Sequence, residues 1–157
     1  MKQKIFQTND LWTPLILRIF LGLVVFPHGA QKLLGWFGGY GFSGTMSFFT
    51  GTVGLPWAMG LLVILLESVG AVVLMAGIAT RLIVINYILL AIGIVFSSHI
   101  ENGFFMNWFG NQAGEGYEYF LLWIGLATGL AISGGGKFSV DKEIIMKNKP
   151  ALVPSKV

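Results

Sequence analysis

The chain has 157 residues, of which 55% are hydrophobic and 11% charged, and its mean hydropathy is +0.76. This composition excludes an ordinary soluble domain, in which charged residues make up about a quarter of the sequence. The net charge of +3 does not indicate nucleic acid, because the lysines gather near the two ends, as in membrane proteins with a fixed orientation. The sequence contains no cysteine, which excludes disulfides and thiolate metal sites within it.

Four apolar runs predict four transmembrane helices, at residues 11–34, 55–78, 82–98 and 117–132. The first run does not resemble a cleavable signal, because Arg18 interrupts it and no small-x-small site follows before Pro27. We therefore expect residues 1–157 to form a single all-α domain. It would be a four-helix transmembrane bundle with a cytoplasmic tail at 133–157.

The basic residues predict the orientation of this bundle. The two longer loops, 35–56 and 98–117, contain neither Lys nor Arg. The basic residues outside the spans all fall on the opposite side: Lys2, Lys4, Arg81, Lys137, Lys142, Lys147, Lys149 and Lys156. Because cytoplasmic loops are enriched in Lys and Arg, both termini are expected in the cytoplasm, and the bundle in a bacterial cytoplasmic (inner) membrane.

The two outer loops are rich in aromatic residues. The first carries no charge, and a short interfacial helix is expected over 43–50, ending at Gly51 before Pro56 starts the next span. The second combines aromatic residues with three carboxylates. One interpretation of both loops is an aromatic belt at the lipid headgroups. The other is that they roof a pocket for a lipid-soluble ring compound.

Glu67 lies near the middle of the second run, where a charge costs about 3 kcal/mol on insertion scales and therefore needs a partner. The predicted partner is Arg18, a charge inside the first run, with Asn86 of the third run nearby. Such a pair would orient the first two spans. A proton-relay or ligand-binding role is the alternative.

A second polar group is predicted near the outer surface. A quinone site needs flat apolar walls and a few polar groups for its oxygens, and a neutral imidazole can accept a quinol proton near physiological pH. The predicted site has Trp36 and Trp108 as walls. Its polar residues are His28, Lys32, His99, Glu115 and Glu118.

Other interpretations of these residues stay open. The two histidines could instead form interfacial hydrogen bonds, and Lys32 could extend toward the headgroups. Haem ligation by His28 and His99 is disfavoured, although two histidines at similar depth on different spans would allow it. Two histidines and scattered carboxylates do not predict any other metal site.

Three segments carry a resemblance to a known family: RIFLGLVVFPHGAQKLLG, ESVGAVVLMAGIATR and HIENGFFMNWFGNQAGEGYEY. With them the chain resembles the DoxX family from about residue 15 to 141. The resemblance implies a small four-helix integral membrane protein, named for a subunit associated with thiosulfate:quinone oxidoreductase and quinol oxidase. The resemblance implies no particular catalytic residue, so the predicted site rests on the chemical argument for a quinone given above.

Three classes of function follow from these observations. The first is a redox-associated module or subunit that binds quinone or quinol in the outer half of the membrane, with a partner enzyme supplying the electrons. The second is a noncatalytic anchor or partner subunit of an oxidoreductase complex, which the lack of a cofactor motif favours. The third is a small-solute or proton carrier, which Glu67 favours. In each case the protein is expected to lie in the lipid bilayer. The expected protein partner is a redox enzyme subunit or a second copy of the chain.

Overall fold

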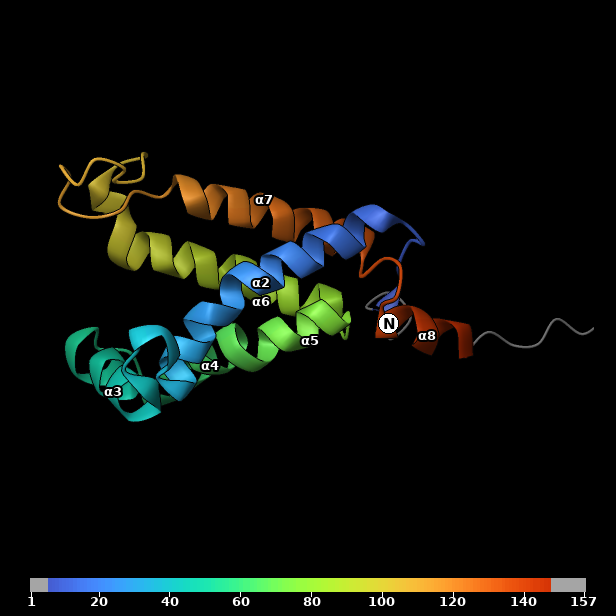
Figure 1. Cartoon of the computed structure of the whole chain (residues 1–157), viewed down its shortest axis with the longest axis horizontal. Helices are drawn as coiled ribbons and strands as arrows, with labels where there is room; N and C mark the ends of the chain where they lie inside the picture. Colours follow the sequence, from blue (N-terminus) through green and yellow to red (C-terminus); the bar gives the residue numbers. More distant parts are fainter. Residues whose placement is uncertain (1–5, 148–157) are drawn as a thin grey trace, which may run out of the picture.

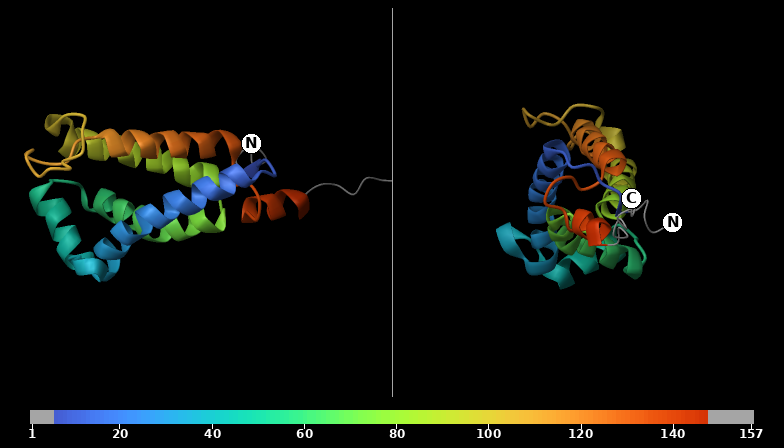
Figure 2. Two further views of the ribbon diagram at one scale, coloured as in Figure 1. Left: turned by 45° about the horizontal axis from the view of Figure 1, so that its top comes forward. Right: turned by 90° about the vertical axis from the view of Figure 1, so that its right-hand side faces the viewer.

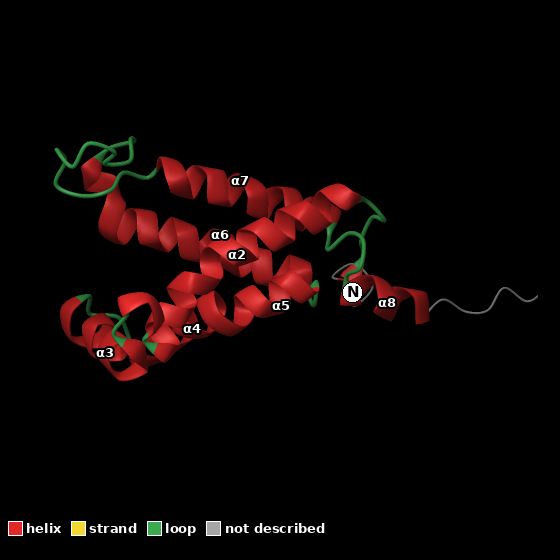
Figure 3. Ribbon diagram, viewed as in Figure 1, coloured by secondary structure: helices red, strands yellow, loops and turns green. Residues whose placement is uncertain are grey.

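The computed structural model describes residues 6–147, and all regular secondary structure in this part of the chain is helical (Figures 1 and 3). Four long helical segments form a bundle. They are α2 (Trp12–Leu34); α4 (Trp57–Leu65) with η3 (Leu66–Gly70) and α5 (Ala71–Ala76); α6 (Thr80–Ile94) with η4 (Val95–His99) and η5 (Ile100–Asn102); and α7 (Glu118–Ser133). Lys2, Lys4, Lys149, Lys156 and the end of the predicted tail lie outside the described residues.

The predicted fold class is confirmed, and the predicted spans match these segments to within a few residues. Trp12–Leu34, Trp57–Ala76 and Thr80–Asn102 have the length and hydropathy needed to cross a membrane. The fourth segment, α7, has 16 residues, about 24 Å at 1.5 Å per residue, which is shorter than the roughly 30 Å hydrocarbon core. Large apolar side chains such as Leu89 and Leu122 point outward, as expected of a surface in contact with lipid.

The arrangement places the two long loops at one end of the bundle (Figures 1 and 2). Helices α6 and α7 lie side by side, and α2 packs against α7 on one side and against η3 and α5 on the other. The turn between α5 and α6, residues 6–11 and the last helix, α8 (Val140–Lys147), lie at the other end. We call the loop end the outer end and the other the inner end.

The core lies where α2, α5, α6 and α7 meet. Val25, Leu74 and Ala127 are fully buried there. The ring of Tyr87 on α6 packs edge-on against Trp123 on α7, with ring centroids 5.6 Å apart. Small side chains among large ones let these helices approach closely, which is the usual way that membrane helices associate.

Two glycines on one face of α2 set its position against the second segment. A Cβ at Gly22 would overlap the Met75 side chain and lie 3.1 Å from the carbonyl oxygen of Ala71. A Cβ at Gly29 would overlap the backbone of Glu67 and Ser68. Backbone therefore touches backbone at Gly29, and the axial register of α2 against η3 is fixed there.

The interfacial helix predicted at 43–50 is present but longer. After the short turn η1 (Trp36–Gly38), helix α3 (Gly41–Ser47) continues into the wider turn η2 (Phe48–Thr52). Gly51 does not end it, because the last turn widens to π geometry instead of breaking. The chain leaves the helix at Gly54, whose positive φ of 75° suits glycine.

The residues after α7 pack against the inner end of the bundle. The amide of Gly136 donates to the Thr8 hydroxyl at 2.6 Å, and that of Lys137 to the carbonyl of Leu11 at 3.1 Å. Ser139 and Asp141 are buried although both are polar. The start of the predicted tail is therefore a packed part of the fold, because its backbone amides bond to the segment that precedes α2.

Asp141 caps the start of α6. Its carboxylate accepts hydrogen bonds from the backbone amides of Ala79, at 2.7 Å, and Thr80, at 2.8 Å. The first amides of a helix have no partner within the helix and carry partial positive charge, so a carboxylate stabilises them. Because Asp141 is 1% exposed, water cannot easily replace it.

Replacing Asp141 by alanine is expected to destabilise the protein by about 2 kcal/mol, since two buried amides lose their acceptor. The measurement is thermal unfolding of the purified protein in detergent. Glu143→Ala is the matched control, because Glu143 is an exposed acid on the same helix. Equal melting temperatures for the two variants would contradict the capping role.

Candidate functional site

The central feature of the site is a buried ion pair between Lys32, near the end of α2, and Glu67 in η3. The Lys32 ammonium lies 2.5 Å from Oε2 of Glu67. The side chain of Glu67 is 3% exposed and that of Lys32 is 25% exposed. The carboxylate is therefore enclosed, while the ammonium also reaches a more open space.

Local backbone geometry positions Glu67. The helix widens to a π turn over Leu66–Gly70, and such turns often occur at functional sites. The hydroxyl of Tyr87 on α6 donates to the carbonyl of Leu66 at 3.0 Å, and that of Ser68 to the carbonyl of Ile64 at 2.6 Å. These bonds and the contact at Gly29 hold the Glu67 turn between α2 and α6.

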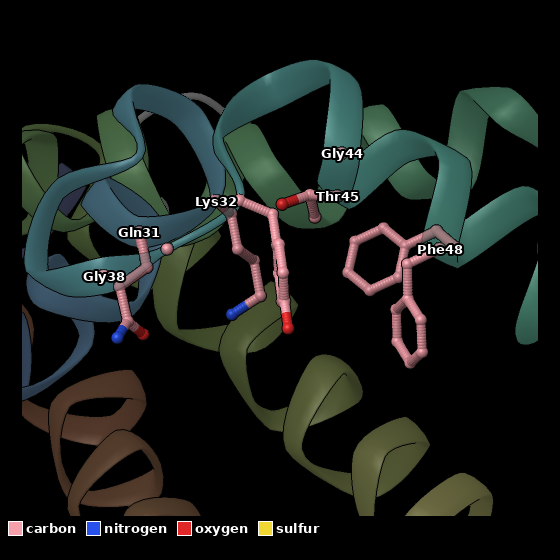
Figure 4. A pocket seen from close by; sticks show the side chains of 9 residues that line it. Gln31, Lys32, Gly38, Gly44, Thr45 and Phe48 are labelled. Atoms are coloured by element: carbon pink, nitrogen blue, oxygen red, sulfur yellow. The ribbon is translucent and has the colours of Figure 1, made fainter.

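A cavity of about 510 Å³ lies between the end of α2 and α3 (Figure 4). Its volume is in the range of known small-molecule sites. Figure 4 shows Lys32 on one side of the space and Phe48 on the other, with Thr45 between them on α3. The lining residues are Gln31, Lys32, Gly38, Gly39, Tyr40, Gly44, Thr45, Phe48 and Phe49.

The cavity combines flat apolar walls with a few polar groups. Phe48 and Phe49 supply aromatic surface, while Tyr40 and Thr45 carry hydroxyl groups. Lys32 is the one charged residue among the described residues that line the cavity. This arrangement suits an uncharged ring compound that accepts a hydrogen bond.

The structure corrects the predicted pairing of Arg18 with Glu67. The guanidinium group of Arg18 donates to the carbonyl of Met75, and to those of Lys137 and Phe138 at 3.1 Å each. Met75 lies eight residues beyond Glu67, which is about 12 Å along a helix. Arg18 thus satisfies carbonyl groups at the inner end of α5, while Glu67 pairs with Lys32 nearer the outer end.

Asn86 does not join either charge. Its side-chain amide donates to the carbonyl of Leu82, one turn earlier on α6, at 2.8 Å. That bond replaces the predicted contact with the charged pair, because an asparagine on an apolar helix can satisfy its donor locally.

Part of the predicted outer polar group does come together, in the loop before α7. The Nδ1 atom of His99 lies 2.7 Å from the carbonyl oxygen of Glu115, and the ring packs on Phe120. The Glu115 carboxylate accepts from the amide of Asn107 at 2.7 Å. Glu118 accepts from the indole of Trp108 at 3.3 Å and from the amide of Met106 at 3.1 Å. These carboxylates hold the loop backbone in place.

The other predicted residues lie apart from that loop network. His28 is exposed on α2, one turn before Lys32. Trp36 is 53% exposed and packs edge-on against Phe37, with ring centroids 6.4 Å apart. Of the residues predicted to bind a ligand, Lys32 is the one that lines the cavity.

Sequence reasoning missed most of the cavity wall. Gln31, Thr45, Phe48 and Phe49 lie around the end of α2 and the interfacial helix. The signal was present in the first outer loop, whose charge-free run of glycines and aromatic residues was one reason to expect a roof over a ring compound. The sequence pattern does not indicate which faces of α2 and α3 oppose each other.

Comparison with known proteins identifies the family. The DoxX family model matches residues 13–100, more than half of the chain. The chain belongs to the DoxX family. It is also 29% identical over 135 residues to a Bacillus subtilis (strain 168) protein named "Putative oxidoreductase CatD", covering 86% of this chain and 88% of that protein. No solved structure matches the chain significantly.

The part that matches the DoxX model contains the buried pair and the whole cavity. Lys32, Glu67 and every lining residue fall within 13–100. Glu115, Glu118 and Trp108 of the second outer loop fall outside it. The DoxX-matching region is therefore the part in which the candidate site lies.

Proposed function

We propose that this DoxX-family protein is a redox-associated module of a bacterial cytoplasmic membrane that binds a quinone or quinol in the cavity between α2 and α3. The observation that carries the proposal is the cavity itself, with an aromatic wall at Phe48 facing a lysine whose charge is neutralised by a buried glutamate. The location at the outer end of the bundle suits a ligand that arrives from the outer half of the bilayer.

The chemistry of the cavity fits a quinone ring. The aromatic side chains offer stacking surface. The Lys32 ammonium has three N–H donors, and one of them is engaged by Glu67, so it can also donate to a quinone oxygen. The hydroxyl groups of Tyr40 and Thr45 offer further hydrogen bonds for a second oxygen.

The association with redox chemistry draws on the name of the Bacillus subtilis relative, "Putative oxidoreductase CatD". In this proposal the chain supplies the binding site, and a partner enzyme subunit supplies or accepts the electrons. The proposal differs from an anchor function in one respect, since an anchor needs no cavity for a ring compound. The proposal also places both termini in the cytoplasm. A reporter that is active only in the cytoplasm, fused to the C-terminus, would test this topology.

The experiment is a titration of the purified protein in lipid nanodiscs with 2-methyl-1,4-naphthoquinone, followed by quenching of tryptophan fluorescence. Phe48→Ala and Thr45→Val are expected to weaken binding, with Phe48→Ala raising Kd by about tenfold, which corresponds to 1.4 kcal/mol. Phe109→Ala is the matched control, because Phe109 is an exposed aromatic residue of the other outer loop.

His99→Ala separates this site from the loop cluster predicted from the sequence. The cavity proposal expects the parent affinity in this variant, because His99 bonds within the second outer loop. Weakened binding in His99→Ala, with unchanged binding in Phe48→Ala, would move the site to that loop. Absence of quinone binding by the parent protein would favour the anchor function.

A further inference from the structure

The charged groups at the cavity differ in their access to it. Lys32 lines the cavity, whereas Glu67 is not among the lining residues and its side chain is 3% exposed. The carboxylate therefore stands behind the ammonium, enclosed by protein. A bound molecule would contact the Lys32 ammonium. The charge of the Glu67 carboxylate would act on that molecule without direct contact.

This arrangement makes the cavity electrically selective. An isolated ammonium at an apolar cavity would attract anions, because charge interactions are strong where water is excluded. Here the carboxylate at 2.5 Å weakens that attraction, so that little of it remains to offset the cost of moving an anion out of water. A cation would instead face the ammonium directly. Neutral molecules that accept a hydrogen bond have neither penalty.

We infer that Glu67 determines which ligand charge the cavity accepts. The paired Lys32–Glu67 group restricts the cavity to neutral ring compounds and rejects organic anions of the same shape. The inference rests on the proposed function, since it concerns the ligand of that cavity. It makes Glu67 a specificity-determining residue that acts through Lys32 and does not touch the ligand.

Other polar groups near Glu67 do not replace this effect. The Tyr87 hydroxyl already donates to the carbonyl of Leu66. His28 lies one turn before Lys32 on α2 but does not line the cavity. The balance of charge at the cavity thus depends on Lys32 and Glu67.

The experiment compares two naphthoquinones of nearly equal size in nanodiscs. 2-Methyl-1,4-naphthoquinone is neutral, and 2-hydroxy-1,4-naphthoquinone is an anion at neutral pH. The parent protein is expected to bind the neutral compound at least about tenfold more tightly. In Glu67→Gln, which leaves Lys32 charged and unpaired, the preference should shrink or reverse because the anion gains affinity.

A pH series on the parent protein tests the inference without any variant. Acidification that protonates 2-hydroxy-1,4-naphthoquinone should bring its affinity to that of the methyl compound, whose own binding serves as the control at each pH. Equal binding of both compounds at neutral pH would overturn the inference and leave the proposed function standing. Failure of the parent to bind either compound would overturn the proposed function itself.

Discussion

Replacing Lys32 by methionine is expected to destabilise the protein by about 3–5 kcal/mol, because the carboxylate of Glu67 would stay buried without its partner. The Glu67 side chain is 3% exposed and its ion pair is with Lys32. Thermal unfolding in detergent measures the effect. The double variant Lys32→Met, Glu67→Met should recover much of the loss, since neither charge then remains in the bundle.

The same substitution at another ion pair provides the control. Lys142 lies 2.9 Å from Asp10 and is about as exposed as Lys32, but the Asp10 side chain is 58% exposed, whereas that of Glu67 is 3% exposed. Exposed pairs contribute about 0–1 kcal/mol, so Lys142→Met should change the melting temperature little. Equal decreases in melting temperature for Lys32→Met and Lys142→Met would mean that the Lys32–Glu67 pair is not buried.

The long helices were predictable because each depends on a local property. A run of apolar residues long enough to cross a bilayer forms a helix, since no other backbone arrangement within one segment satisfies its own hydrogen bonds in lipid. The ends were harder to place. The third segment extends to Asn102, beyond the predicted end at Ser98, because the chain continues from α6 through a wider π turn, η4, and a tighter 3-10 turn, η5.

The need of Glu67 for a partner was also predictable, but the identity of the partner was not. Hydropathy indicates how deep a residue lies along its own helix. It does not indicate the axial register between helices, which here depends on the contact of Gly29 with Glu67. With that contact in place, Lys32 lies one turn beyond it on α2. Arg18 lies fourteen residues before Lys32, about 21 Å along the helix.

The roles of Glu115 and Asp141 could not be predicted for a related reason. Glu115 and Asp141 are charged residues that accept hydrogen bonds from backbone amides. Which amides need an acceptor depends on the tertiary course of the chain, and here they lie at the start of α6 and in the second outer loop. No spacing of residue types in the sequence shows where those amides will lie.

The second large effect is expected from Gly29→Ala, which should cost about 3 kcal/mol or more, at or above the upper end of what overpacking usually costs. The added Cβ would overlap the carbonyl group of Glu67 and the amide nitrogen of Ser68. Backbone atoms of a packed helix cannot move aside as a side chain can. Helix α2 would have to shift away from η3, and the shift would separate Lys32 from Glu67. Binding of 2-methyl-1,4-naphthoquinone should therefore weaken together with the melting temperature.

Gly125→Ala is the matched control for this variant, because a Cβ at Gly125 on α7 would meet no atom within 4 Å. Alanine favours a helix over glycine by about 1 kcal/mol, so Gly125→Ala should keep or slightly raise the melting temperature and leave quinone binding unchanged. At Gly29 the same gain in helix propensity is smaller than the expected loss from the backbone overlap. A Gly29→Ala variant as stable as Gly125→Ala would mean that α2 does not rest on the Glu67 turn, and the register that pairs Lys32 with Glu67 would be wrong.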